Sequence, residues 1–263
     1  MEKALHGERQ IVFITGEPGI GKTSLVEAFL ARLADEHEHE HETWIGRGQC
    51  IEHYGAGEAY MPVLEALGRL GREPGGTQLI TMLRRYALSW LVQLPALVSV
   101  AEREKLRQEA QGATRERMLR ELAEALDALA IKHPLVLVLE DLHWSDVSTL
   151  DLLSVLTRRP ERARLLVIGT YRPVDILANG HPLRAVVQEL QLHRQCEELR
   201  LGFLTEENVA AYLATRFRLD PSSLAGEGQD GGCRANRPAS SPLTLTPSTG
   251  LRTGLSRKGR GNP

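Results

Sequence analysis

The chain has 263 residues, of which 42% are apolar and 25% charged, and its formal net charge is −2. This composition is typical of a globular protein, and the near-neutral charge gives no electrostatic reason to expect nucleic-acid binding. No apolar run reaches the roughly 20 residues that a membrane span needs, and the N-terminus MEKALHGERQ lacks an apolar signal core. The 3 cysteines are far apart, which favours reduced thiols over a disulfide frame or a zinc site. We therefore expect a cytoplasmic protein with no membrane contact.

Apolar runs of strand length alternate with helical patterns from the N-terminus onwards. IVFIT has the β-rich apolar character of a strand that is buried on both faces. Up to residue 130 we expect a strand at 11–15, a helix at 24–34, a charged connector at 35–42, a strand at 43–50, a helix from Pro62 to about residue 70, and helical segments at 77–94 and 114–130.

The same alternation continues in the second half of the chain. LVLVL is the clearest buried strand of the sequence, and Ser145 or Asp146 suits the N-cap of the helix that follows it. The remaining expected elements are strands at 135–139, 164–171 and 198–204, and helices after Asp146, from Pro182 and after Thr205. Alternation of this kind over residues 11–217 predicts an α/β fold, with a mainly parallel sheet covered by helices on both faces.

The composition changes near the C-terminus. From Gly231 to Pro263 there is no acidic residue, but there are six Lys or Arg and many Gly, Ser, Thr and Pro. A segment of this composition is typical of a disordered tail, and the abrupt change also fits a shifted reading frame. We expect a domain at 1–220 with a helical insertion at about 61–130, followed by a disordered or aberrant basic tail at 221–263.

A glycine-rich loop, GEPGIGKT, stands between the first strand and the first long helix. It fits the pattern GxxxxGK[ST] with Gly16, Gly21, Lys22 and Thr23 at the fixed positions. Glycines let the loop turn its N–H groups inward, and the helix start adds free N–H groups and a positive dipole end. The lysine would neutralise β- and γ-phosphates, and the threonine hydroxyl would ligate Mg²⁺. The alternative is a strand-to-helix turn that binds no ligand.

An acidic pair, Glu140 and Asp141, directly follows the apolar run LVLVL. One carboxylate can hold Mg²⁺, usually through water, while the other orients or deprotonates an attacking water. A dication offsets the repulsion between the two carboxylates. The alternative is an acidic helix cap after a core strand.

A third polar pair ends the run LLVIGTYRP. Thr170 and Arg172 stand where a strand ends, so they could reach a γ-phosphate and report whether it is present. An arginine in this position is otherwise a common surface residue, and it gains functional meaning from the two motifs before it.

Four segments in this order, GEPGIGKTSLVEAF, RGQCIEHYGAGEAYMPVLEAL, LVLVLEDLHWSD and LLVIGTYRP, resemble the origin-recognition-complex-like AAA ATPase domains of bacterial regulators. Those domains belong to the signal-transduction ATPases with numerous domains (STAND). The resemblance covers about residues 8–220. It implies a P-loop NTPase with strand order 5-1-4-3-2, ATP and Mg²⁺ as ligands, a nucleotide-driven switch, and partner domains in a larger regulator.

By this resemblance Glu140 takes the metal position, Asp141 the water-orienting position and Arg172 the γ-phosphate-sensing position. The phosphate-loop positions fall on Gly16, Gly19, Gly21, Lys22, Thr23 and Ser24. The commonest residue at the metal position in the family is aspartate, so Glu140 is one methylene longer. The family also carries an upstream segment ending in a Val-Gly-Arg-Glu-like motif, which we expect this chain to lack. It further carries a helical lid and a winged helix with a Gly-x-Pro motif, which the final Gly261-Asn262-Pro263 resembles. We expect adenine recognition and switching to depend on those parts.

Three hypotheses follow for the function. The first is an ATP-binding switch module with slow hydrolysis, and it is the one that the three motifs favour. The second is a small-molecule phosphotransferase, which would need an acceptor site and often a lid arginine cluster. The third is a truncated remnant that binds no nucleotide and at most contacts partner proteins.

Overall fold

The computed structural model describes residues 1–36, 43–52 and 58–217. Most of the expected connector at 35–42 and the whole expected tail at 221–263 lie outside the described residues. The chain divides into one unit from Met1 to Leu204 and a second that begins at Thr205. The expected domain boundary near residue 220 and the expected helical insertion stay predictions.

The first unit is built on a five-stranded sheet in the order β2-β3-β4-β1-β5, in which all neighbouring strands run parallel. The predicted order 5-1-4-3-2 is confirmed, since it is the same order taken from the other edge. The last strand is shorter than the predicted 198–204. The strands are β1 (Gln10–Thr15), β2 (Trp44–Gln49), β3 (Leu135–Glu140), β4 (Leu165–Tyr171) and β5 (Glu197–Arg200).

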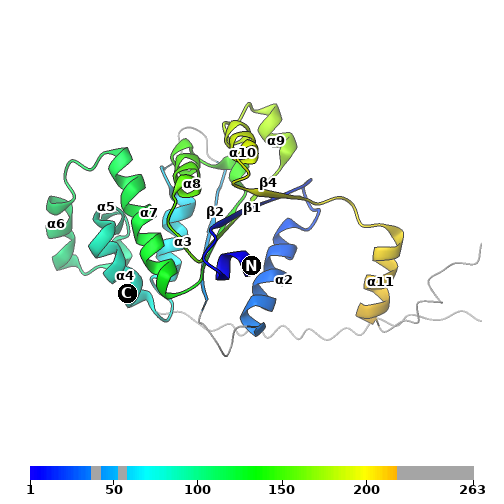
Figure 1. The fold of residues 1–263 in the computed structure, drawn as a ribbon, viewed down its shortest axis with the longest axis horizontal. Coiled ribbons are helices and arrows are strands. Elements are labelled where there is room, and N and C mark those ends of the chain that lie inside the picture. The colour runs from blue at the N-terminus through cyan, green and yellow to red at the C-terminus, as the bar shows by residue number, and fades with distance from the viewer. Residues whose placement is uncertain (37–42, 53–57, 218–263) are drawn as a thin grey trace, which may run out of the picture. The chain divides into compact units, whose positions relative to one another are not determined.

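Helices cover both faces of this sheet (Figure 1). On one face α1 and α2 pack on alternate residues of β1, β3 and β4. On the other face the core is formed with α3, α7, α8 and α10. Between β2 and β3 the chain forms α3 to α7. The helices of the first unit are α1 (Glu2–Leu5), α2 (Lys22–Glu36), α3 (Met61–Leu70), α4 (Gly76–Tyr86), α5 (Leu88–Val92), α6 (Val100–Glu109), α7 (Arg115–Lys132), α8 (Val147–Arg158), α9 (Pro173–Ala178) and α10 (Leu183–Leu192), with 3-10 turns η1 (Pro95–Leu97) and η2 (Leu142–Trp144).

The central strands explain why the sequence pattern was so clear there. All seven residues of β4 and five of six in β3 are buried, because both faces of a parallel sheet are covered and both must be apolar. The strands also end in register: Gln49 lies opposite Glu140, and Thr15 lies opposite Tyr171. The carboxyl ends of β1 to β4 therefore meet at one edge of the sheet, which is where the predicted motifs lie.

Helix boundaries follow from side-chain caps. The Thr114 hydroxyl accepts a hydrogen bond from the Arg117 amide at the start of α7, and Asp146 caps α8.

The single helical segment predicted at 77–94 is wrong, because the helix is interrupted at Ala87, where φ is −139°. The break turns α5 so that Trp90 is fully buried and its indole N–H donates to the Met118 carbonyl at 2.8 Å.

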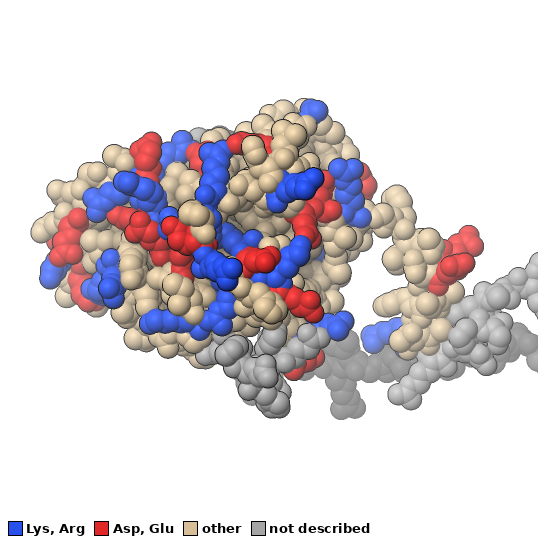
Figure 2. Space-filling model, in the orientation of Figure 1, with Lys and Arg blue, Asp and Glu red and all other residues tan. Residues whose placement is uncertain are grey.

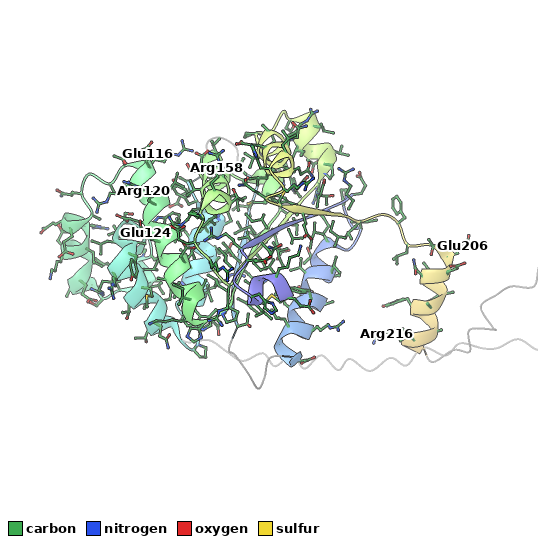
Figure 3. All side chains as sticks on the ribbon, in the orientation of Figure 1. Glu116, Arg120, Glu124, Arg158, Glu206 and Arg216 are labelled. Carbon is green, nitrogen blue, oxygen red and sulfur yellow. The ribbon has the colours of Figure 1, made fainter. Side chains whose placement is uncertain are left out.

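Charged side chains lie along the outer surfaces of the helices. Figure 3 shows Glu116, Arg120 and Glu124 following one another along α7 at intervals of four residues, the spacing at which opposite charges support a helix. On the face drawn in Figure 2, basic and acidic side chains are interspersed. Within the described ranges 1–36, 43–52 and 58–217, no helix has the length and apolar character to cross a membrane.

The described part of the second unit is a single helix, α11 (Glu206–Phe217). As predicted, Thr205 caps it, since its hydroxyl accepts a hydrogen bond from the Asn208 amide at 3.2 Å. Acidic residues in the first turn and Arg216 in the last turn complement the helix dipole.

Candidate nucleotide-binding site

The glycine-rich loop joins the end of β1 to the start of α2. Gly19 and Gly21 have φ angles of +75° and +102°, and a Cβ atom at either position would meet nothing within 4 Å. Backbone conformation, rather than lack of space, therefore requires glycine at these two positions. At position 16 space also requires glycine, because a Cβ atom there would lie 2.8 Å from Ile20 Cγ2 and 3.0 Å from the Leu201 carbonyl oxygen.

Lys22 is enclosed by this loop. The residue is only 8% exposed. Its ammonium donates hydrogen bonds to the carbonyl oxygens of Gly16 at 2.8 Å and Glu17 at 2.9 Å. Burial lowers the pKa of Lys22 below its ordinary value, and the nearby Arg172 lowers it further. Two cations thus face the same space, and a polyanionic ligand between them would relieve their repulsion.

Thr23 and Glu140 are joined directly, although 117 positions separate them. The Thr23 hydroxyl donates to Glu140 Oε2 at 3.1 Å, and the guanidinium of Arg47 on β2 donates to Oε1 at 2.8 Å. Arg47 also lies 3.9 Å from Glu27 Oε1 on α2. Hydroxyl and carboxylate oxygens are the ligands that Mg²⁺ prefers, so this pair fits a shared magnesium ion.

Such an ion would need further ligands from the nucleotide or from water. Among the residues that the structure describes, no three His, Cys, Asp or Glu side chains come together in an arrangement that could hold a metal by themselves. Mg²⁺ commonly retains several waters and takes phosphate oxygens as ligands, so two protein oxygens are sufficient for a nucleotide-bound ion.

Asp141 is held in an unusual backbone conformation. Its φ and ψ angles are 57° and 43°, in the left-handed region that only a few per cent of residues other than glycine adopt. Its amide donates to the hydroxyl of Thr170 on β4 at 3.0 Å, and Gln49 on β2 donates to its Oδ2 at 3.2 Å. Asp141 is therefore fixed from both strands that flank β3.

Arg172 directly follows β4 and precedes α9. Its Nη1 lies 3.6 Å from Asp175 Oδ2, and its buried Nε has no hydrogen-bond partner. The side chain of Arg172 is 34% exposed and that of Asp175 is 30% exposed, so the pair lies at the rim of the site and is accessible to a ligand.

His143 lies beneath this pair and is fully enclosed. Its Nε2 is 3.4 Å from Asp175 Oδ2 and its Nδ1 is 4.0 Å from Asp141 Oδ1, and neither nitrogen makes a hydrogen bond. Burial lowers the pKa of His143, although the Asp141 carboxylate opposes this effect. The ring is accordingly neutral at pH 7, with one N–H to donate.

The sheet edge brings together five of the predicted residues: Lys22, Thr23, Glu140, Asp141 and Arg172. Ser24 lies exposed in the first turn of α2. Sequence reasoning did not assign the four further polar residues around them, which are Arg47, Gln49, His143 and Asp175. The signal for Arg47 and Gln49 was their place at the end of a strand next to β3. For His143 and Asp175 the signal was their nearness in sequence to the second and third motifs.

Comparison with known proteins identifies a family for this chain. The model of the family described as AAA ATPase domain matches residues 1–168, a range that includes the glycine-rich loop and the Glu140–Asp141 pair and ends before Arg172. Among curated proteins, the chain is similar to the uncharacterized protein R02095 of Rhizobium meliloti (strain 1021), at 28% identity over 204 residues. That alignment covers 71% of this chain and 19% of the relative, so the chain spans only a small part of that protein's length.

Two solved structures also resemble the chain. One is the Walker-type ATPase PABY2304 of Pyrococcus abyssi, with a TM-score of 0.40, 14% identity, and coverage of 85% of this chain and 58% of that one. The other is VirB4 of Thermoanaerobacter pseudethanolicus, with a TM-score of 0.31, 11% identity, and coverage of 83% of both chains. Since the family match extends over more than half of the 263 residues, the chain belongs to the AAA ATPase domain family.

Proposed function

We propose that the chain is a Mg²⁺-dependent ATP-binding module with slow hydrolysis, which acts as a nucleotide-dependent switch in a larger regulator. One observation carries this proposal: a phosphate-binding loop, a hydroxyl–carboxylate pair, a fixed aspartate and a rim arginine converge at one sheet edge. This is the set of groups that nucleotide phosphoryl chemistry uses.

The loop and Lys22 would hold the phosphates of ATP. Gly19 and Gly21 present open backbone, and the start of the 15-residue helix α2 adds its N–H groups and dipole. Thr23 and Glu140 would hold Mg²⁺, which when bound offsets the negative charge of the phosphates. The buried ammonium of Lys22 would exchange its loop carbonyls for phosphate oxygens, which are stronger acceptors.

Asp141 would orient the attacking water, and Arg172 would contact the γ-phosphate. Slow turnover follows from how these groups are held. The Glu140 carboxylate is occupied by Arg47 and Thr23, and Arg172 is paired with Asp175. Hydrolysis then requires rearrangement of existing contacts, which lowers the fraction of molecules that are competent to react.

The switch role rests on the resemblance to STAND regulators, with signal transduction or transcription regulation as the output. We propose that the domain at 1–220 works in the cytoplasm beside other domains of a larger protein, with ATP or ADP as ligand. The match to only 19% of the length of a curated relative fits a module within a longer chain.

The test is thermal unfolding of the purified chain with and without Mg·ATP. A ligand at 100 times its Kd adds about 2.7 kcal/mol of stability, which raises the Tm by roughly 5–10 °C for a unit of this size. Lys22→Ala should abolish the shift. Lys105→Ala, which removes a side chain that is 78% exposed on α6, is the matched control and should retain it.

Each alternative has its own outcome. A chain that melts cooperatively but shows no shift with Mg·ATP would refute the proposal and favour a remnant that has lost nucleotide binding. A phosphorylated product that forms only with a specific small-molecule acceptor would instead identify a phosphotransferase.

A further inference from the structure

Asp175 lies between two potential hydrogen-bond donors. Its Oδ2 is 3.6 Å from Arg172 Nη1 on the rim side and 3.4 Å from His143 Nε2 on the buried side. Both distances are slightly longer than a normal hydrogen bond, so a shift of well under 1 Å would complete either contact. The carboxylate can therefore associate with one donor or the other at little cost.

The unsatisfied ring of His143 favours such a change of partner by Asp175. Its side chain is 0% exposed, and both ring nitrogens lack a hydrogen bond in the state that the structure shows. An unsatisfied buried donor is costly, and more than nine in ten buried polar groups have a partner. The ring is thus poised to donate a hydrogen bond to Asp175 once the carboxylate no longer pairs with Arg172.

We propose that Asp175 limits the preference of the site for ATP over ADP, because it restrains Arg172 until a γ-phosphate competes for it, and that His143 positions Asp175 after release. The inference rests on the proposed function. A γ-phosphate offers Arg172 a stronger, bidentate acceptor than Asp175 does. The cost of breaking the ion pair therefore falls on the binding of ATP alone, since ADP leaves the pair in place.

Opposite effects are expected for the two residues. Asp175→Asn keeps the shape of the side chain and frees Arg172, so affinity for an ATP analogue should rise about fivefold, as for the loss of an ion pair at a partly exposed site. His143→Leu removes the second donor and leaves Asp175 dependent on Arg172, so affinity for the analogue should fall by a similar factor. Affinity for ADP should change much less in both variants.

Isothermal titration calorimetry with a non-hydrolysable Mg·ATP analogue and with Mg·ADP measures these ratios. Glu109→Gln, which removes the acid of an i,i+4 pair with Lys105 on α6, is the matched control for Asp175→Asn. His143→Gln retains an N–H donor and should recover the ratio that His143→Leu loses, which a purely structural effect would not predict. In an Arg172→Ala background, Asp175→Asn should no longer change the ratio of the two affinities.

The outcomes separate this inference from the function beneath it. A wild-type chain that binds neither nucleotide would overturn the proposed function, and the inference with it. A wild-type chain that binds both, with an unchanged analogue-to-ADP ratio in Asp175→Asn, would overturn the inference alone. A change that persists in the Arg172→Ala background would also overturn it.

Discussion

Two glycines on β2 face the same side of the sheet but meet different neighbours. A Cβ atom on Gly48 would lie 1.7 Å from the backbone carbonyl oxygen of Pro62 in α3. A Cβ atom on Gly46 would lie 2.9 Å from Leu70 Cδ1 and 3.3 Å from Leu137 Cδ1, which are the ends of flexible side chains. Gly48→Ala must therefore displace helix backbone, whereas Gly46→Ala needs only rotamer changes.

The size of the difference can be estimated from these distances. At position 48 the two atoms must separate from 1.7 Å to at least 3.0 Å, which moves the start of α3 and should cost more than ~3 kcal/mol, above the usual range for overpacking. At position 46 overpacking costs about 1–2 kcal/mol. The stiffer unfolded chain offsets about 0.4–1 kcal/mol in both variants, so this effect cancels in the comparison. We expect Gly48→Ala to be the less stable protein by at least about 1 kcal/mol.

Equilibrium unfolding in urea tests this, because such a difference separates the two midpoints by roughly 0.5 M or more. Gly48→Ala should also lose nucleotide binding. The Gln49 amide donates to Glu65 of α3 at 2.8 Å, and its side chain donates to Asp141, so a displaced α3 disturbs the site. Equal midpoints for the two variants, or a wild-type midpoint for Gly48→Ala, would refute the reasoning.

Two further predictions concern stability. Asp127→Asn should destabilise the fold by about 3 kcal/mol, because Asp127 pairs with the buried guanidinium of Arg9 and accepts from Arg159 Nε at 2.6 Å; a urea midpoint within error of wild type would contradict this. The Nδ1 of His181 accepts a hydrogen bond from the Leu183 amide at 3.2 Å, and burial lowers the pKa of His181. The contribution of His181 to the free energy of unfolding should be complete above about pH 6.5. It should be lost as the pH falls, since the unfolded chain binds more protons than the folded one. Unfolding at several pH values should show a shallower loss for His181→Gln, and parallel profiles would count against the assignment.

Most of the fold could be predicted because its signals are local. The strands β3 and β4 are apolar throughout, and the helix from Pro62 carries its own start signal. The elements missed were short or polar. The helix α6 buries only Leu106 among its ten residues, so it has no apolar stripe to reveal it, although Ser99 and Glu102 form a recognisable capping box.

The site was predictable only where its residues are close in sequence. The loop and the acidic pair are each contained in a few positions, so spacing alone identifies them. The contacts of Arg47 and Gln49 depend on β2 lying beside β3 in one particular register, with Gln49 opposite Glu140. A shift of one residue would turn both side chains to the opposite faces, so no local pattern could assign them.

Asp141 shows what tertiary structure adds. Nothing in LVLVLEDLHW marks the aspartate as left-handed, and the conformation costs of the order of 1 kcal/mol or more for a residue other than glycine. The conformation persists because the Asp141 amide donates a hydrogen bond to the Thr170 hydroxyl, and the Gln49 side chain donates one to the Asp141 carboxylate. A neighbouring strand on each side thus stabilises a backbone that the segment itself disfavours. Asp141 is thus held from two directions at the end of β3. The water-orienting role that we propose requires a carboxylate fixed in this way, which favours Asp141 over Glu140 for that role.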